Sequence, residues 1–278
     1  LNAEADILSC TLPKAVMTTS PIINNNSVTL FVGPGTDVSA LAPEFTLTPG
    51  ATISPLSGTV HDFNLPQKYT GTAADGVWKK TYTGSVIDTE LATNYNFEDT
   101  LGGKKYYIFV ERQEDKVIME WASGNAGYAM TGVPKTADDY PTFQIADGKE
   151  GKCLSLVPRS TGFFGQLMGM PIAAGNLFIG SFDVNNAMSY PLQATKFGLP
   201  FRYVPTYLAG YYKYKAGDKF TEEGKPVDGK RDICDIYAIM YETSESVPTL
   251  DGSNAFTSPN LVSIARIDNA KETDEWTY

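Results

Sequence analysis

The chain has 278 residues, 42% of them hydrophobic and 19% charged, so it is long enough to bury a substantial core in one large domain or two smaller ones. Its formal net charge of −10 argues against nucleic acid and anionic membrane surfaces as partners, because both require clustered Lys and Arg side chains. No stretch reaches the roughly 18 apolar residues of a membrane-spanning helix, so we expect no membrane insertion by this chain.

The first strand-like segments lie between residues 27 and 87. "SVTLFV" begins at Ser27 and alternates polar and apolar side chains, and "KYTGT" and "VWKKTYTG" flank a turn at Ala74-Asp75-Gly76 that is typical of a hairpin. Short strands at this spacing predict a small β-sandwich over residues 1–87. The opening "NAEADI" and the hairpin resemble the immunoglobulin-like modules at the front of secreted, carbohydrate-related proteins of gut Bacteroidetes, which implies an immunoglobulin-like domain here.

A second series of strands follows a polar segment. "DTELATNYNFED", directly after Ile87, lacks a strand pattern, so we place a domain boundary near residue 88. No later segment shows a helical apolar stripe over several turns, and helices should therefore be minor in residues 88–278. The strand-like runs of this part are "YYIFVER", "VIMEWAS", "GKCLSLVP", "LFIGSFDV", "RYVPTYLAGYYKYKAG", "DICDIYAIMYET" and "NLVSIARI".

Several of these runs resemble one Bacteroidetes family, the putative carbohydrate metabolism domain. The long "FGLPF…GYYKY" run is the specific feature, and "WASGNAG", "ADGKEGKCLSLVPRSTG" and "DICDIYAIMYET" agree with it over roughly residues 95–278. The resemblance implies a β-sandwich jelly roll like those of carbohydrate-active enzymes and their binding modules. Family members usually continue past an "EWTY"-like segment, so we expect either a chain cut after Tyr278 or a sheet closed in another way.

Candidate sugar-binding residues follow from the chemistry of a pyranose. Its C–H faces pack on flat aromatic rings, and its hydroxyl groups pair with planar polar side chains. In "GYYKY" the strand pleat places Tyr211 and Lys213 on one face and Tyr212 and Tyr214 on the other, and the sequence leaves open which face meets a ligand. The proposed ligand-binding residues are Trp121, Asn125, Arg202, Tyr211, Tyr212, Lys213, Tyr214 and Glu242.

Each of these residues also has a structural interpretation. Trp121 could fill the sandwich core, Asn125 could serve only as a turn residue, and the tyrosines could form a cross-strand ladder without any ligand. Arg202 could pair with Asp235 or Glu242 from the run "DICDIYAIMYET". In that run we expect Ile236, Ala238 and Met240 to form the core face, with Glu242 in register with them.

Three functions remain open. We favour a carbohydrate-binding accessory protein of glycan utilisation, with a sugar pocket in the C-terminal jelly roll and an oligosaccharide or polysaccharide as partner. A glycoside hydrolase would need paired carboxylates, for which Asp235 and Glu242 are the candidates, but no strand carries several acids at alternating positions. The third function is a structural or adhesive envelope protein.

The sequence contains few patterns that would indicate a bound cofactor or a disulfide bond. Loop oxygens in "FDVNNA" and "LDGSN" lack the spacing of a calcium loop, so we predict no cofactor or metal beyond a structural calcium as an open alternative. Cys10, Cys153 and Cys234 allow at most one disulfide, and His61, the one histidine on which a catalytic triad could depend, is expected to be a surface or turn residue. The resemblance implies a cell-envelope location, in the periplasm or as a surface lipoprotein whose signal segment is absent from this chain, with other glycan-utilisation proteins nearby.

Overall fold

The fold is built from β-strands, as the sequence predicts. The computed structural model describes residues 2–13, 16–24, 26–222, 224–244, 246–267 and 270–278. Within them the three α-helices, Asn125–Ala129 (α1), Gly162–Leu167 (α2) and Pro191–Ala194 (α3), contain at most six residues each. None of these helices is long and apolar enough to cross a membrane. The prediction of an all-β protein is therefore confirmed.

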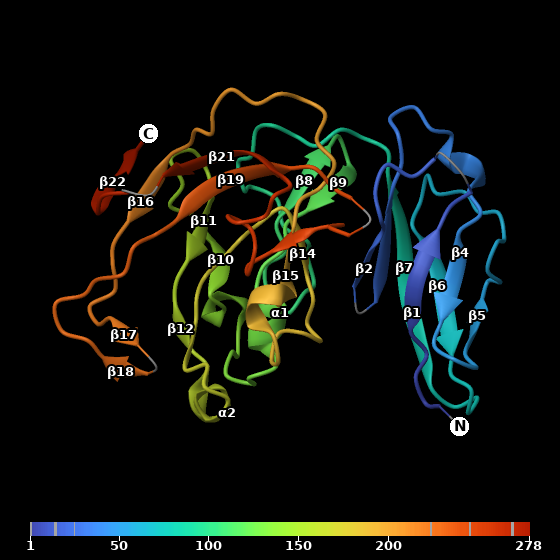
Figure 1. Ribbon diagram of the computed structural model, residues 1–278, viewed down its shortest axis with the longest axis horizontal. Helices are drawn as coiled ribbons and strands as arrows, with labels where there is room; N and C mark the ends of the chain where they lie inside the picture. The colour runs from blue at the N-terminus through green and yellow to red at the C-terminus, as the bar shows by residue number, and fades with distance from the viewer. Residues whose placement is uncertain (1, 14–15, 25, 223, 245, 268–269) are drawn as a thin grey trace. The chain divides into compact units, whose positions relative to one another are not determined.

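The chain divides into two compact units. Unit 1 comprises Leu1–Ala92 with Gln113–Met119 and Leu199–Arg202, and unit 2 comprises Thr93–Arg112, Glu120–Gly198 and Tyr203–Tyr278. Figure 1 shows both units, with labels on most of their strands, and each is described by itself below.

Unit 1 is a sandwich of a five-stranded and a two-stranded sheet. The larger sheet has the order β2-β3-β7-β6-β5, in which β3 and β7 run parallel and the other neighbours antiparallel. Its strands are β2 (Ile22–Asn24), β3 (Ser27–Phe31), β7 (Lys79–Ile87), β6 (Gln67–Thr72) and β5 (Thr52–Ser54). The smaller sheet pairs β1 (Ile7–Thr11) with β4 (Glu44–Leu47).

The core of unit 1 explains an irregular feature of its sequence. Leu30, Tyr69 and Tyr82 are almost wholly buried in one apolar cluster between the sheets. Gly71 interrupts β6 because a Cβ atom there would lie 2.7 Å from the carbonyl oxygen of Ala5. The hairpin predicted from the sequence joins β6 to β7, and the strands pair in register from Gln67 opposite Gly84 to Thr72 opposite Lys79.

Unit 2 consists of short antiparallel pieces of sheet. Among its described residues the pairs and one triplet of strands are β10-β11, β12-β13, β14-β15-β20, β16-β22, β17-β18 and β19-β21, and the hairpin β8-β9 has residues in both units. The strands are β8 (Val110–Gln113), β9 (Lys116–Glu120), β10 (Thr142–Ile145), β11 (Cys153–Leu156), β12 (Arg159–Ser160), β13 (Ile172–Ala173), β14 (Gly180–Phe182), β15 (Thr195–Phe197), β20 (Leu250–Asp251), β16 (Tyr212–Tyr214), β22 (Thr273–Thr277), β17 (Thr221–Glu222), β18 (Lys225–Pro226), β19 (Ile236–Tyr241) and β21 (Leu261–Ile267). Two 3-10 turns, Val38–Ala40 in unit 1 and Ala137–Asp139 in unit 2, complete the elements.

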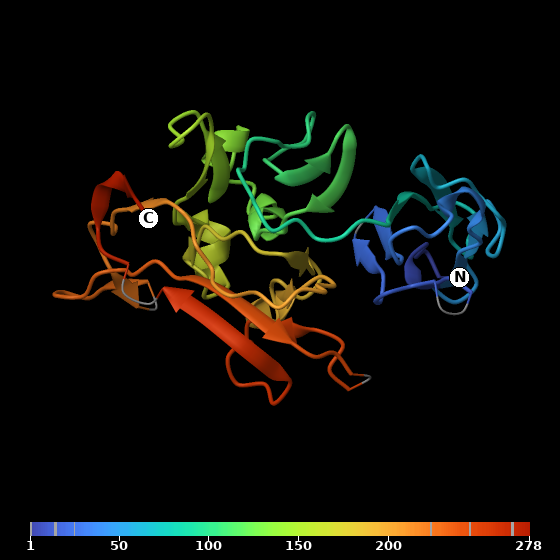
Figure 2. The ribbon, with the colours of Figure 1, turned by 90° about the horizontal axis from the view of Figure 1, so that it is seen from above.

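Aromatic rings hold these small sheets together. Phe197 lies edge-on to Phe178 and to Tyr237, which in turn contacts Phe256 with ring centres 4.8 Å apart. These rings join β15 to the long antiparallel pair β19-β21, drawn in orange and red in Figure 2. The core of unit 2 is therefore a chain of side-chain contacts between separate sheets.

Candidate functional site

The strand pair β16-β22 presents aromatic rings on one face. Tyr212 lies opposite Thr277 and Tyr214 opposite Thr273, and the side chains of Tyr211 and Lys213 alternate to the other face. On that face the ring of Tyr211 contacts the ring of Tyr278 with centres 5.2 Å apart, and both are open to solvent, with exposed fractions of 49% and 75%. Figure 1 shows the two strands side by side.

A second segment adds charged groups to these rings. The turn between β10 and β11 brings the Lys149 ammonium to 3.8 Å from the centre of the Tyr211 ring. Asp147, in the same turn, accepts a hydrogen bond of 3.2 Å from Lys213, whose ammonium also lies 5.1 Å from the centre of the Trp276 ring. We define the aromatic patch as Asp147, Lys149, Tyr211, Lys213, Trp276 and Tyr278.

The turn that carries Asp147 and Lys149 is tightly folded. Gly148 donates its backbone N–H to the carbonyl of Gly151, which has a φ of 67°, in the region that favours glycine. The carboxylate of Glu98 accepts the backbone N–H of Lys152 at 2.7 Å, and Gln144 donates to the carbonyl of Glu98. These contacts fix the position from which Lys149 reaches Tyr211.

The other two tyrosines of "GYYKY" face the interior of unit 2. Tyr212 and Tyr214 are half-buried, and the Tyr214 hydroxyl donates a 2.6 Å hydrogen bond to the carbonyl of Asp232. Burial, followed by the nearby Asp232 carboxylate, raises the pKa of Tyr214. Of the four predicted residues in this run, the structure therefore places Tyr211 and Lys213 in the patch and the other pair behind it.

Trp121 belongs to a separate, half-buried cluster. Its indole N–H donates a 2.8 Å hydrogen bond to Oε1 of Glu111, and its ring lies 4.9 Å from Tyr95 and 5.5 Å from Phe97. Glu111 is only 9% exposed. Burial raises the pKa of the Glu111 carboxyl, Asp99 adds to the rise, and the indole hydrogen bond opposes it. Glu111 is a candidate acid that no local sequence pattern marks within the acid-rich "ERQEDKVIME".

Asn125 lies in the interior of unit 2. Its side chain has an exposed fraction of 0%, donates to the carbonyl of Thr142 at 2.7 Å and accepts the backbone N–H of Thr142 at 3.2 Å. These two bonds tie the first residue of α1 to the first residue of β10. Because its amide is fully engaged and shielded from solvent, we leave Asn125 out of the proposed binding surface.

Arg202 and the two candidate catalytic acids fall in different units. Arg202 is exposed and falls in unit 1. Asp235 forms a bidentate ion pair with Arg266, and both N–O distances are 2.8 Å. Asp235 precedes β19 and Glu242 follows it, so about 23 Å of extended strand separates them. Glycoside hydrolysis requires carboxyl groups about 5 to 10 Å apart, and these two acids therefore cannot act as a pair.

The faces of β19 also differ from the expected arrangement. Ala238, expected on the core face, is exposed. On the opposite face Tyr237 packs on Phe256, and the Tyr241 hydroxyl donates to the carbonyl of Phe197. The tyrosine face of β19 therefore packs against rings of the interior, among them Phe197 of β15.

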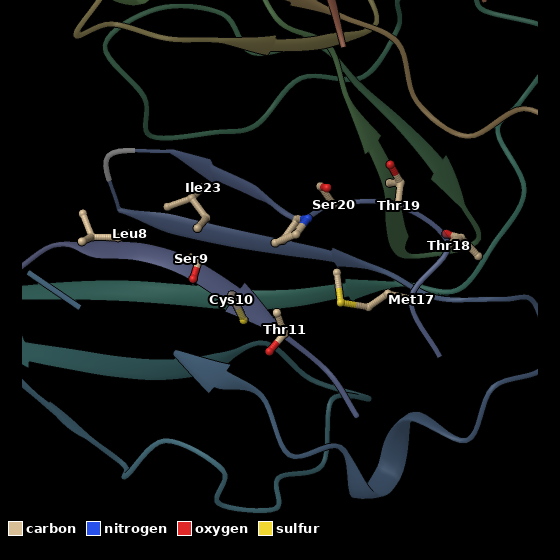
Figure 3. Close-up of a pocket in the computed structure, with 10 residues that line it drawn as sticks. Leu8, Ser9, Cys10, Thr11, Met17, Thr18, Thr19, Ser20 and Ile23 are labelled. Carbon is tan, nitrogen blue, oxygen red and sulfur yellow. The ribbon is translucent and has the colours of Figure 1, made fainter. Parts of the chain in front are cut away.

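A hollow of about 510 Å³ lies on unit 1 between β1 and the segment that leads into β2. Figure 3 shows its lining, in which Ser9, Cys10 and Thr11 come from β1 and residues 17–21 and 23 from the facing segment. The ten described lining residues include no aromatic ring and no charged group. The hollow therefore lacks the groups that sugar recognition uses.

The described residues give no support for metal binding or for chemistry at a cysteine thiol. In the described part of the chain no three His, Cys, Asp or Glu side chains lie together in an arrangement that could hold a metal ion. Cys10, Cys153 and Cys234 are all free, and burial raises the pKa of the Cys10 thiol to about 12. Half-buried His61 packs edge-on against Tyr69, with ring centres 5.7 Å apart.

Comparison with known proteins gives two family matches. Residues 96–278 match the family described as "Putative carbohydrate metabolism domain", which is more than half of the chain. The chain belongs to this family. Residues 7–86 match the family described as "SGBP, N-terminal". The carbohydrate metabolism domain contains every residue of the aromatic patch, and the resemblance noted in the sequence is confirmed.

Two solved structures are similar over long stretches. One, a putative glycoside hydrolase from Bacteroides thetaiotaomicron, is 84% identical with a TM-score of 0.95, and the match covers 100% of this chain and 81% of that one. The other, a putative glycoside hydrolase from Bacteroides vulgatus, is 46% identical with a TM-score of 0.61 over 66% of this chain and 74% of that one. No curated protein matches. Together the matches support a glycan-related role for the carbohydrate metabolism domain.

Proposed function

We propose that the protein binds oligosaccharide or polysaccharide through the aromatic patch of unit 2. The observation that carries this proposal is the gathering of exposed rings and hydrogen-bonding side chains on one face of β16-β22. Tyr211 and Tyr278 offer aromatic rings to a pyranose, while Lys149 over the Tyr211 ring and the pair of Lys213 with Asp147 supply hydrogen-bonding groups beside them. The family match to a carbohydrate metabolism domain supports the choice of a sugar as ligand.

The proposed location is the cell envelope. The match of residues 7–86 to the SGBP N-terminal family supports a place outside the cytoplasm. There the protein would hold a glycan for other proteins of glycan utilisation to process.

The first test of binding removes one ring. We expect Tyr211→Ala to weaken binding to glycans by up to about tenfold, because a well-packed aromatic contact contributes about 0.5 to 1.5 kcal/mol. The measurement is affinity electrophoresis or calorimetry against a panel of polysaccharides, with the melting temperature as a check of folding.

The matched control for this test is Tyr190→Ala. Tyr190 is also an exposed tyrosine, with a fraction of 59%, and it precedes α3 outside the aromatic patch. Equal binding by the wild type and Tyr211→Ala, with both proteins folded, would contradict the proposal. So would a loss of affinity as large in Tyr190→Ala as in Tyr211→Ala.

Glycoside hydrolysis centred on Glu111 is a second candidate. A shielded carboxyl with a raised pKa beside an aromatic ring suits a general acid, and Asp99 is the nearby second carboxyl. Both similar structures are described as putative glycoside hydrolases.

Product analysis distinguishes hydrolysis from binding. A hydrolase would release new reducing ends from a bound glycan, Glu111→Gln would reduce that release at least a hundredfold, and Glu114→Gln on the same hairpin would leave it intact. If the wild type binds a glycan and releases no product, the hydrolase proposal is wrong and the binding proposal is retained.

A further inference from the structure

The two lysines of the aromatic patch differ in how their charges are compensated. Lys213 lies 3.2 Å from the Asp147 carboxylate, so its charge is paired within the protein. Lys149 lies 3.8 Å from the centre of the Tyr211 ring, and no carboxylate of the described residues lies within 4.0 Å of its ammonium. Lys149 therefore contributes an unpaired positive charge at the edge of the proposed binding surface.

The position of Lys149 affects which sugars can use Tyr211. A cation held over an aromatic face is attracted to the negative face of the ring. A neutral pyranose that stacks on the same face must displace the ammonium and gains no ionic contact in return. A pyranose with an anionic substituent can instead pair with the displaced ammonium while its C–H groups contact the ring.

The charge of the whole chain strengthens this distinction. With a formal net charge of −10, the protein repels polyanions in general, so an acidic polymer will not bind to it without a specific cation. At physiological ionic strength this repulsion is screened beyond about 8 Å, and the local contact with Lys149 then decides the outcome.

We propose that the aromatic patch recognises acidic glycans, with Lys149 pairing to a carboxylate or sulfate on a sugar whose ring packs against Tyr211 and Tyr278. This inference rests on the proposed function and specifies its substrate class. The rigid turn between β10 and β11 holds the cation in place, because Glu98 anchors that turn through the backbone of Lys152.

The experiment compares three polymers as probes. Polygalacturonate carries carboxylates, dextran sulfate carries sulfates, and dextran is neutral. We expect the wild type to bind at least one charged polymer more tightly than dextran, and Lys149→Gln to weaken that binding about fivefold, as expected for loss of an exposed ion pair. Lys149→Arg should retain most of the affinity. The charged polymer that responds identifies the anionic group.

The matched control is Lys152→Gln. This removes the same charge from the same turn, at a lysine whose ammonium lies over no ring of the described residues. Equal losses in Lys149→Gln and Lys152→Gln would indicate a general charge effect and overturn the proposal. A wild type that binds neither charged polymer, or a Lys149→Gln variant that binds both unchanged, would also overturn it.

Failure of this inference differs from failure of the proposed function. If dextran binding depends on Tyr211 and no variant of Lys149 alters the preference among polymers, the patch binds sugar without selecting for charge. If Tyr211→Ala binds all three polymers as the wild type does, the patch is not the binding surface.

Discussion

Tyr211 and Tyr212 are adjacent residues of the same kind in different surroundings. The pleat of the strand exposes the first ring to solvent beside Lys149 and turns the second toward the interior. Glu111 and Glu114 form a similar contrast on one hairpin, because only Glu111 is buried and bonded to an indole. For a single residue, burial and the groups it contacts therefore decide the role of its side chain.

Glu111 allows a prediction about pH. Its pKa is raised above the ordinary 4.5, so the folded protein binds the proton more tightly than the unfolded chain, and stability falls as the pH rises through the folded pKa. We expect Glu111→Gln to remove this loss. The stability of Glu111→Gln relative to wild type should increase from pH 4 to pH 7, because only the wild type has a carboxyl that must ionise in a buried position.

Denaturant unfolding at several pH values measures this effect. Glu114→Gln is the control, since Glu114 is exposed on the same hairpin. A constant difference between Glu111→Gln and wild type at all pH values would show that ionisation of Glu111 has no effect on folding.

The turn between β10 and β11 is the element that determines the site. It supplies two patch residues, and its shape depends on Gly148 and Gly151. A side-chain hydrogen bond also holds α1 in place, because Asn125 bonds the helix to β10. Elements this short have little intrinsic stability, so individual side-chain bonds hold them in place.

Gly151 provides the test at this scale. A Cβ atom at Gly151 would lie 2.1 Å from Oε1 of Glu98, and its φ of 67° disfavours other residues. We expect Gly151→Ala to cost about 1 to 2 kcal/mol of folding stability and to weaken glycan binding, because the turn moves Lys149 away from Tyr211.

Thermal melting and the polymer binding assay measure the two effects of Gly151→Ala. Gly102→Ala is the control, because a Cβ atom there meets no atom within 4 Å and its backbone φ is not in the left-handed region. If both variants melt and bind alike, the turn does not position the cation.

For the whole molecule, the sequence predicted local features better than contacts between distant segments. Strand content, the hairpin at Ala74-Asp75-Gly76 and the alternation of "GYYKY" depend on neighbouring residues, and the structure shows all three. The patch joins segments far apart in the chain, such as Lys213 and Asp147, which are 66 positions apart. Trp276, Tyr278 and Lys149 were therefore missed, because no local period encodes which turn packs beside which strand.

The turn between β10 and β11 contributes no aromatic ring to the patch, whereas Trp276 lies in β22 and Tyr211 and Tyr278 lie directly before β16 and after β22. The capacity to hold a sugar face and the preference for its charge therefore reside in separate lengths of polypeptide. A related protein with a different turn between β10 and β11 could therefore bind glycans of different charge while it keeps the same aromatic rings.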